Sequence, residues 1–95
     1  MKKTNTENKT PDQLGEIACY APYLTAVERI KMARESTPWL RGRVACYALY
    51  LTTEQRMELA RESTPNWREQ ISRYVQGLTV EQRAELKKQE GKNEN

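Results

Sequence analysis

Histidine is absent from the 95 residues of this chain, and cysteine occurs only twice, at Cys19 and Cys46. Neither thiol therefore has the imidazole base that usually activates a nucleophilic cysteine. Two thiols without histidine also fall short of the four ligands that a zinc site requires. We expect a protein that is not an enzyme, with no catalytic residue, no bound metal and no cofactor.

Glycine is scarce, with four residues in the chain, and no glycine-rich loop of the kind that binds phosphate is present. Long apolar runs are missing as well, because no stretch approaches the roughly 18 residues of a membrane span. The lysines near the N-terminus are not followed by the apolar segment of a secretory signal. These absences predict a cytoplasmic protein that does not associate with membranes.

Charge of one sign is not concentrated in the central part of the chain. The formal net charge is +3, and residues 1–9 carry +2 of it. Residues 10–90 contain 12 basic and 11 acidic side chains, which are interleaved along the sequence. A dedicated nucleic-acid-binding protein usually concentrates its basic residues on one face. The even distribution therefore favours a protein partner over nucleic acid.

What the chain does contain is a repeat with a period of 27 residues. Residues 10–36 match residues 37–63 at 15 of 27 positions without an insertion, and residues 64–90 form a third copy. Fixed-period similarity of this kind is typical of stacked arrays, in which each unit buries its apolar face against its neighbours. Six columns are identical in all three copies, namely Thr10, Pro11, Tyr20, Leu24, Thr25 and Arg29 with their equivalents.

Each copy contains the start signals of two helices. A Thr-Pro pair opens the first, because the threonine hydroxyl caps free amides and proline suits the first helical position. A Leu-Thr pair opens the second, and a Glu or Gln three residues after the threonine completes a capping box. Pro22 is expected to kink or shorten the first helix of copy one, and Gly77 to adopt a left-handed conformation after the first helix of copy three. The expected helices are 11–23, 38–50 and 65–76 for the first of each copy, and 26–35, 53–62 and 80–90 for the second.

Together these signals predict an all-α fold of six short helices. The three 27-residue αα-hairpin repeats are expected to stack as a short α-solenoid-like bundle. We expect the helical domain to span residues 10–90, with disordered polar tails at 1–9 and 91–95.

Apolar residues at helical spacing indicate the core. Tyr20, Tyr47 and Tyr74 fall on this stripe at the same place in each copy, so all three are expected in the core. Met57 and Ala60 are expected to complete the core from the second helix of the central copy. In that copy the stripe of the first helix runs through Leu40, Val44, Tyr47, Ala48 and Leu51.

A second stripe on the first helix consists of Trp39, Arg43, Cys46 and Tyr50 in the central copy. It becomes wholly polar in the third copy, which suits a terminal unit and predicts a finite, monomeric stack. Cys19 and Cys46 occupy equivalent positions of neighbouring helices, which lie about 9–10 Å apart. That separation exceeds the limit of about 7 Å between the Cα atoms of a disulfide. We expect both thiols to be free and mostly buried.

Four residues of the first helices and their ends are candidates for a partner-binding surface. They are Trp39, Arg43 and Tyr50, with Tyr23 nearby. Tryptophan, tyrosine and arginine are the residue types that dominate binding hot spots. The alternative is that these aromatic rings form the core between neighbouring units, and the two roles are compatible if the rings are half-buried.

Arg41 and Arg43 are candidates for a second reason, because both lie in the first turns of one helix, and Arg68 repeats Arg41 in the next copy. A helix N-terminus together with a guanidinium favours an anion such as phosphate or a partner's carboxylate. The alternative is an ordinary solvated charge. The identical Arg29, Arg56 and Arg83 either align as a ladder for a phosphate backbone or pair with acids three or four positions away.

Met32 and Leu59 are the last candidates, and with Leu86 they lie at equivalent positions of the second helices. If they are exposed, they form an apolar groove for a partner helix. The alternative is that a helix between two neighbours needs two apolar faces.

These observations lead to a protein–protein interaction module acting as an adaptor, inhibitor or regulator, with another protein as its partner. The alternative is a nucleic-acid-binding regulator. In that hypothesis the join between copies resembles a helix-turn-helix, with Trp39, Arg41 and Arg43 at the start of the recognition helix.

Overall fold

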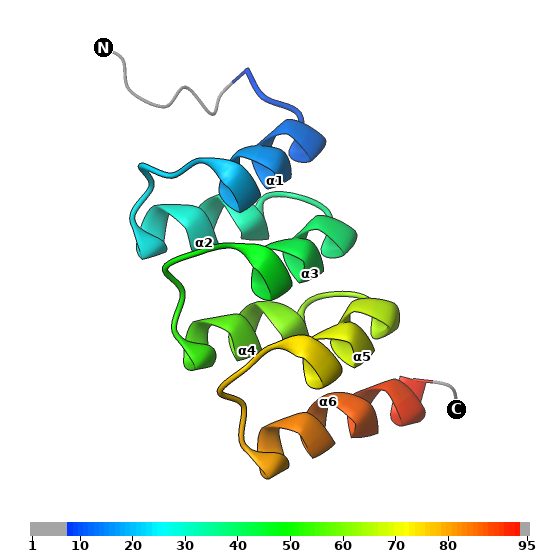
Figure 1. The fold of residues 1–95 in the computed structure, drawn as a ribbon. Helices are drawn as coiled ribbons and strands as arrows, with labels where there is room; N and C mark the ends of the chain where they lie inside the picture. Colours follow the sequence, from blue (N-terminus) through cyan, green and yellow to red (C-terminus); the bar gives the residue numbers. More distant parts are fainter. Residues whose placement is uncertain (1–7, 94–95) are drawn as a thin grey trace.

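The structure is a computed structural model that describes residues 8–93, with side chains as far as Lys88. The described residues form six helices and no strand, which confirms the all-α fold (Figure 1). Most of the two predicted tails, residues 1–7 and 94–95, lies outside the described residues. In chain order the helices are α1 (Pro11–Tyr20), α2 (Ala26–Arg34), α3 (Pro38–Tyr47), α4 (Thr53–Arg61), α5 (Pro65–Tyr74) and α6 (Val80–Asn93).

The helices are arranged in two rows (Figure 1). One row contains α1, α3 and α5, and the other contains α2, α4 and α6. Each helix contacts its hairpin partner and the neighbouring hairpin, whereas within residues 8–93 the first hairpin does not contact the third. The result is an elongated molecule of 45 × 27 × 15 Å.

Threonine caps begin the helices as the sequence predicts. Thr25 Oγ1 accepts a hydrogen bond from the Glu28 amide at 3.1 Å, and the Glu28 carboxylate accepts one from the Thr25 amide at 3.0 Å. The same reciprocal pair recurs at Thr52 with Gln55 and at Thr79 with Gln82, so all three predicted capping boxes are confirmed. Removing such a cap costs a helix about 1 kcal/mol.

The first helix of each hairpin is shorter than predicted, since α1, α3 and α5 end at Tyr20, Tyr47 and Tyr74 instead of near residues 23, 50 and 76. Pro22 does not explain this, because the equivalent positions hold Leu49 and Gln76 and the helices end at the same place. The last helix is longer than predicted, because α6 continues to Asn93 instead of ending at residue 90.

A buried arginine of the second helix meets the end of the first helix in the same hairpin. Arg29 is 1% exposed and donates hydrogen bonds to the carbonyl oxygens of Ala18 at 2.9 Å, Ala21 at 2.7 Å and Leu24 at 3.0 Å. These bonds cover carbonyls at the end of α1 and in the turn that follows. A charged donor makes strong hydrogen bonds to carbonyls that a helix end leaves unpaired.

The equivalent arginines of the other hairpins act in the same way. Arg56 donates to Ala45 O at 2.9 Å, and Arg83 donates to Ser72 O and to Val75 O. Both hypotheses for these arginines, a phosphate ladder and pairing with acids along the helix, are therefore replaced by a structural role. The identical arginine column joins the second helix of each hairpin to the end of the first.

The core contains most of the residues that helical spacing indicated. Leu40, Val44, Ala48 and Leu51 are all buried, and Met57 and Ala60 are fully buried in α4. Met32, Leu59 and Leu86 are buried too, at 4%, 0% and 0% exposure. Helices α2 and α4 therefore have two apolar faces, as the alternative hypothesis held, whereas Ala84 on the other face of α6 is exposed. Met32, Leu59 and Leu86 do not form an exposed groove.

The prediction for the three identical tyrosines was wrong. Tyr20, Tyr47 and Tyr74 are 58%, 58% and 64% exposed. Each is the last residue of its helix, and the chain turns away immediately after it. A tyrosine ring at the last residue of a helix packs against the core on one side, and its other side faces solvent.

Glycines set the close approach of neighbouring hairpins. A Cβ atom added to Gly15 of α1 would lie 2.6 Å from Leu40 Cβ of α3, and one added to Gly42 of α3 would overlap Trp67 of α5. Each glycine thus leaves room for a large side chain of the next hairpin. The equivalent of these glycines in the third hairpin is Glu69.

Candidate functional site

All five tyrosines of the chain are exposed, at fractions between 58% and 75%. Three of them end α1, α3 and α5, and two lie three residues further on, in the turns that lead to α2 and α4. Because α1, α3 and α5 run in the same direction, their ends lie on one side of the molecule (Figure 1). We call this set the tyrosine edge: Tyr20, Tyr23, Tyr47, Tyr50 and Tyr74.

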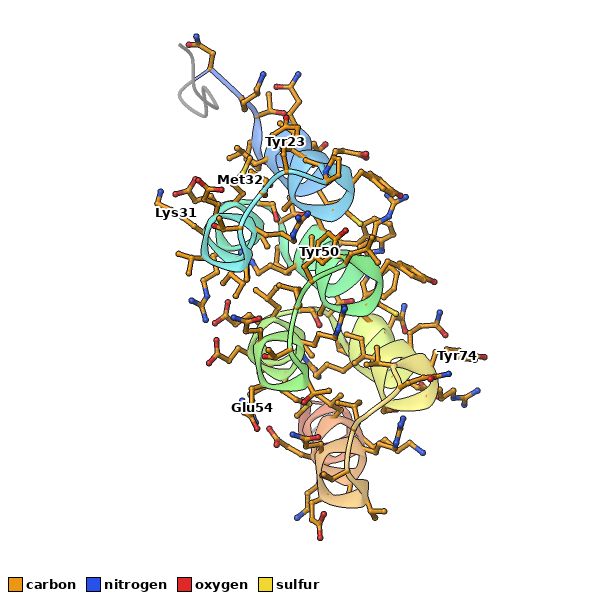
Figure 2. All side chains as sticks on the ribbon, turned by 60° about the vertical axis from the view of Figure 1, so that its left-hand side comes forward. Tyr23, Lys31, Met32, Tyr50, Glu54 and Tyr74 are labelled. Carbon is orange, nitrogen blue, oxygen red and sulfur yellow. The ribbon has the colours of Figure 1, made fainter. Side chains whose placement is uncertain are left out.

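Figure 2 looks onto the side that carries these turns. Tyr23 and Tyr50 lie one below the other on it, and Tyr74 projects outward from α5. Leu49, in the turn beside Tyr50, is 62% exposed and enlarges the apolar area. Aromatic residues are enriched at protein–protein interfaces, so this exposed group is the candidate site.

Arg43 of α3 connects the tyrosine edge to Trp39. Its guanidinium carbon lies 5.1 Å from the centre of the Tyr20 ring and 5.7 Å from that of Trp39, distances at which a cation is attracted to an aromatic face. The same guanidinium donates a hydrogen bond to Tyr20 Oη and lies 3.8 Å from Glu16. Arg43 therefore holds two exposed rings in fixed positions.

The indole of Trp67 packs against the rings of Trp39 and Tyr47. Its ring centre lies 5.4 Å from that of Trp39 and 5.8 Å from that of Tyr47, with interplanar angles of 72° and 88°. Edge-to-face pairs of this kind add about 0.5–1.5 kcal/mol to the effect of burial. Trp67 is 9% exposed, whereas Trp39 is 50% exposed. The buried indole thus gives the exposed rings a rigid base.

Tyr50 adopts a backbone conformation that tyrosine normally avoids. Its φ is +68°, and it is the one residue other than glycine with a positive φ between residues 8 and 93. The equivalent position in the third hairpin is Gly77, with φ +91°. A non-glycine residue in this region costs about 1–2 kcal/mol, and such strain tends to occur at functional sites.

The structure separates the residues proposed for partner binding into two groups. Trp39, Arg43, Tyr23 and Tyr50 lie on the surface just described, with Arg43 half-buried between its rings. The others have internal partners or are buried. These are Arg41, Arg68, Met32 and Leu59.

Arg41 and Arg68 bond to the main chain at the ends of α2 and α4. Arg41 donates to the carbonyl oxygens of Ala33, Ser36 and Glu62 at 3.0–3.3 Å. Arg68 is 4% exposed and donates to Ser63 O at 2.8 Å. Neither the anion site nor the solvated charge proposed for them describes these positions, because both side chains join neighbouring helices.

Every arginine of the chain has an internal partner. Five donate to main-chain carbonyls, and four lie within 4.0 Å of a carboxylate. The second group is Arg34 with Glu58 and Glu62, Arg43 with Glu16, Arg61 with Glu85, and Arg73 with Glu69.

The start of α3, which the nucleic-acid hypothesis treats as a recognition helix, lies beside acidic residues. A depression of about 280 Å³ separates it from α1 and is lined by Asp12, Glu16, Thr37, Trp39 and Leu40. Carboxylates at this place repel a phosphate backbone, whose neutralisation supplies most of the affinity for nucleic acid.

The two thiols are free, with Cys19 buried and Cys46 partly buried. Burial raises the pKa of both thiols, although Arg43 opposes the effect at Cys19 and Arg56 opposes it at Cys46. A thiol with a raised pKa holds little thiolate at neutral pH and is a poor nucleophile.

Two other kinds of site are missing from the part of the chain that the structure describes. That part contains no group of three or more side chains that could hold a metal ion. None of its helices is long and apolar enough to cross a membrane.

The tyrosines that end α1, α3 and α5 were missed as site residues, although the sequence held a signal. The core positions of the first helices vary between copies, as at Gln13, Leu40 and Trp67, whereas the tyrosine column does not. A residue type that is retained while neighbouring core positions change indicates a requirement beyond packing.

The chain matches no protein-family model, no curated protein and no solved structure.

Proposed function

We propose that this protein is a protein-binding module that uses the tyrosine edge, together with Trp39 and Arg43, as its contact surface. The observation that carries the proposal is the exposure of all five tyrosines, each of which ends α1, α3 or α5 or lies in the turn that follows α1 or α3. Tyrosine offers a large, rigid contact area with a polar tip, and it loses little conformational entropy on binding.

The contacts beneath the surface support the same proposal. Arg43 holds Tyr20 and Trp39 in place, and Trp67 supports Trp39 and Tyr47. A surface that is rigid before binding loses less free energy when the partner arrives. The strained backbone at Tyr50 adds a further argument, since the third hairpin has glycine at this position.

The nucleic-acid alternative has no observation of its own in its favour. The guanidinium of Arg41 bonds to three carbonyls, and that of Arg43 lies between two rings and near Glu16. Both groups would have to leave these partners to contact phosphate. A small adaptor, inhibitor or regulator that binds another protein remains the function we propose.

Selection from a random peptide library displayed on phage tests this proposal even while the natural partner is unidentified. Peptides are selected on the full chain and then measured against a double variant, Tyr23→Ser with Tyr50→Gly. These two side chains are 75% and 67% exposed, so the variant is expected to fold. The matched control is Val80→Ser, which changes an 80% exposed apolar residue at the start of α6.

We expect the selected peptides to bind the double variant at least about tenfold more weakly than the parent, as for loss of hot-spot residues. The Val80→Ser control should bind like the parent. Equal binding to all three proteins would contradict the proposal. So would a failure to select any peptide combined with salt-sensitive binding of a labelled oligonucleotide.

A further inference from the structure

Three members of the tyrosine edge form a regular ladder. Tyr20, Tyr47 and Tyr74 are the last residues of α1, α3 and α5, at equivalent positions of the 27-residue repeat. Their spacing is therefore that of neighbouring helices, about 8–10 Å. Gly15 allows α3 to approach α1 closely, and Gly42 allows α5 to approach α3 in the same way.

We propose that this ladder binds a proline-rich segment of a partner protein in the polyproline II conformation. The inference rests on the proposed function and specifies the partner's chemistry. A polyproline II helix has three residues per turn and a rise of about 3.1 Å, so one side of it repeats about every 9.3 Å. One residue in every three then meets a successive tyrosine ring.

Other regular peptide conformations do not match this spacing. An α-helix repeats about every 5.4 Å along its axis. An extended strand presents the same face about every 6.6–6.8 Å. Neither repeat coincides with three successive tyrosines, whereas the polyproline II repeat does so without distortion of either partner.

Hydrogen bonding points to the same ligand. A polyproline II segment has no internal hydrogen bonds, and its prolines carry no N–H group, so its main chain offers acceptors. The tyrosine ladder offers hydrogen-bond donors to these acceptors, because each tyrosine carries a hydroxyl group at the end of its flat ring. Exposed aromatic rings with such donors are the recurring means of recognising proline-rich segments.

Arg43 fixes the ring at the first position of the ladder. Its guanidinium lies between the rings of Tyr20 and Trp39, and Trp39 is in the first turn of α3, away from the helix ends that carry the tyrosines. The ligand runs along those ends, across α1, α3 and α5. The segment binds already extended, so it loses little chain entropy on binding.

Fluorescence anisotropy with labelled synthetic peptides tests the inference. The first peptide has about 12 residues, enough for four turns of polyproline II, with proline at every third position. The second has the same composition with the prolines grouped at one end. A helix-forming peptide and an oligothymidine of similar length with the same label complete the set.

We expect the first peptide to bind the full chain at least about tenfold more tightly than the other three probes. Tyr47→Ser and Tyr74→Ser should each weaken its binding several-fold, and Val80→Ser should leave it unchanged. Tyr47→Phe keeps the ring and its contact with Trp67, so it isolates the hydroxyl and should cause a smaller loss.

Two results would overturn the inference: equal affinity for the two proline peptides, or tighter binding of the helix-forming peptide. Selection of peptides without regular prolines that still need Tyr23 and Tyr50 would do so as well, while leaving the proposed function intact. If the oligothymidine is the tightest ligand and library selection also fails, both the inference and the proposed function are wrong.

Discussion

At the scale of the residue, Tyr50 occupies a backbone conformation that glycine would adopt with less strain. Its backbone lies in the left-handed region with φ +68°, and its ring is 67% exposed. The third hairpin meets the same requirement with Gly77. Glycine has no steric penalty in this region, although it gives up more chain entropy on folding. The tyrosine therefore contributes less to folding than glycine would, and its ring is available for another role.

Replacing Tyr50 with glycine should raise the free energy of unfolding. We expect an increase of about 0.5–1 kcal/mol, the relief of left-handed strain minus the extra entropy of glycine. Urea unfolding followed by circular dichroism measures the change. The matched control is Tyr23→Gly, where φ is not positive, and there the unfolding free energy should fall. A loss of stability in both variants would show that Tyr50 is not strained.

At the scale of the element, the identical arginines of the second helices explain where the first helices end. Hydrophobic periodicity continues past Tyr20, Tyr47 and Tyr74, yet the chain leaves the helix at each of them. Arg29 reaches back from α2 and bonds carbonyls of α1 and of the turn after it. The two helices of a hairpin are thus joined by a charged group that must not lose its partners once buried.

Substituting Arg29 with lysine should be costly. Lysine keeps the charge but lacks the planar fork that bonds three carbonyls at once. We expect the free energy of unfolding to fall by about 2–4 kcal/mol, since buried acceptors lose their donors. Arg34→Lys, on the exposed side of the same helix, should cost less than about 1 kcal/mol. Similar losses in the two variants, measured by chemical denaturation, would rule out the capping role.

The link between α4 and α6 predicts a pH dependence. Arg61 bonds both carboxylate oxygens of Glu85, at 2.6 and 3.1 Å, and these bonds lower the pKa of Glu85 below its ordinary value of 4.5. A carboxyl whose pKa is lowered by folding stabilises the fold above its ordinary pKa. That contribution is lost as the pH falls through the folded-state pKa.

Because the pair is well exposed, its contribution should be less than about 1 kcal/mol. Glu85→Gln should therefore lower the unfolding free energy slightly at neutral pH, and the difference from the parent should vanish once the pH falls below the folded-state pKa of Glu85. A carbon-detected NMR titration of the Glu85 carboxyl measures the pKa directly. Titration at the ordinary value would contradict the bidentate pair.

At the scale of the whole molecule, each terminal hairpin lacks one of the features by which neighbouring hairpins pack together. Leu40 and Trp67 each pack over a glycine of the preceding hairpin, Gly15 and Gly42. The first hairpin has Gln13 in place of the large apolar side chain, and the third has Glu69 in place of the glycine. Glu69 pairs with Arg73 at 2.6 Å. A further hairpin could not pack in the same way at either end. The first hairpin offers no large apolar side chain to it, and the third offers no glycine against which such a side chain could pack.

Restoring both features should make the chain associate end to end. In the double variant Gln13→Leu with Glu69→Gly, one end gains the apolar side chain and the other gains the gap. Such heterologous contacts do not close and produce chains of increasing length. We expect concentration-dependent assembly of the double variant in sedimentation velocity, with each single variant sedimenting like the parent. A double variant that also sediments like the parent would show that other contacts prevent the association.

Local chemistry accounts for what the sequence predicted correctly. Helix starts depend on contacts within four residues, namely the threonine caps, the capping boxes and the proline at the first helical position. They can therefore be predicted without knowledge of the tertiary structure. The repeat then indicated which residues recur on one face, and burial of Val44, Met57 and Ala60 followed from that.

Only the tertiary structure decided which of the residues that are identical in all three copies are buried and stabilise the fold, and which are exposed on the surface. Arg29 and Tyr20 are equally invariant between copies, yet the arginine is buried as a helix cap and the tyrosine is exposed. Periodicity placed Tyr20 in the core because the sequence does not show a helix ended by a group 9 residues further along the chain. Long-range hydrogen bonds and the packing of neighbouring hairpins set that end, and with it the tyrosine edge.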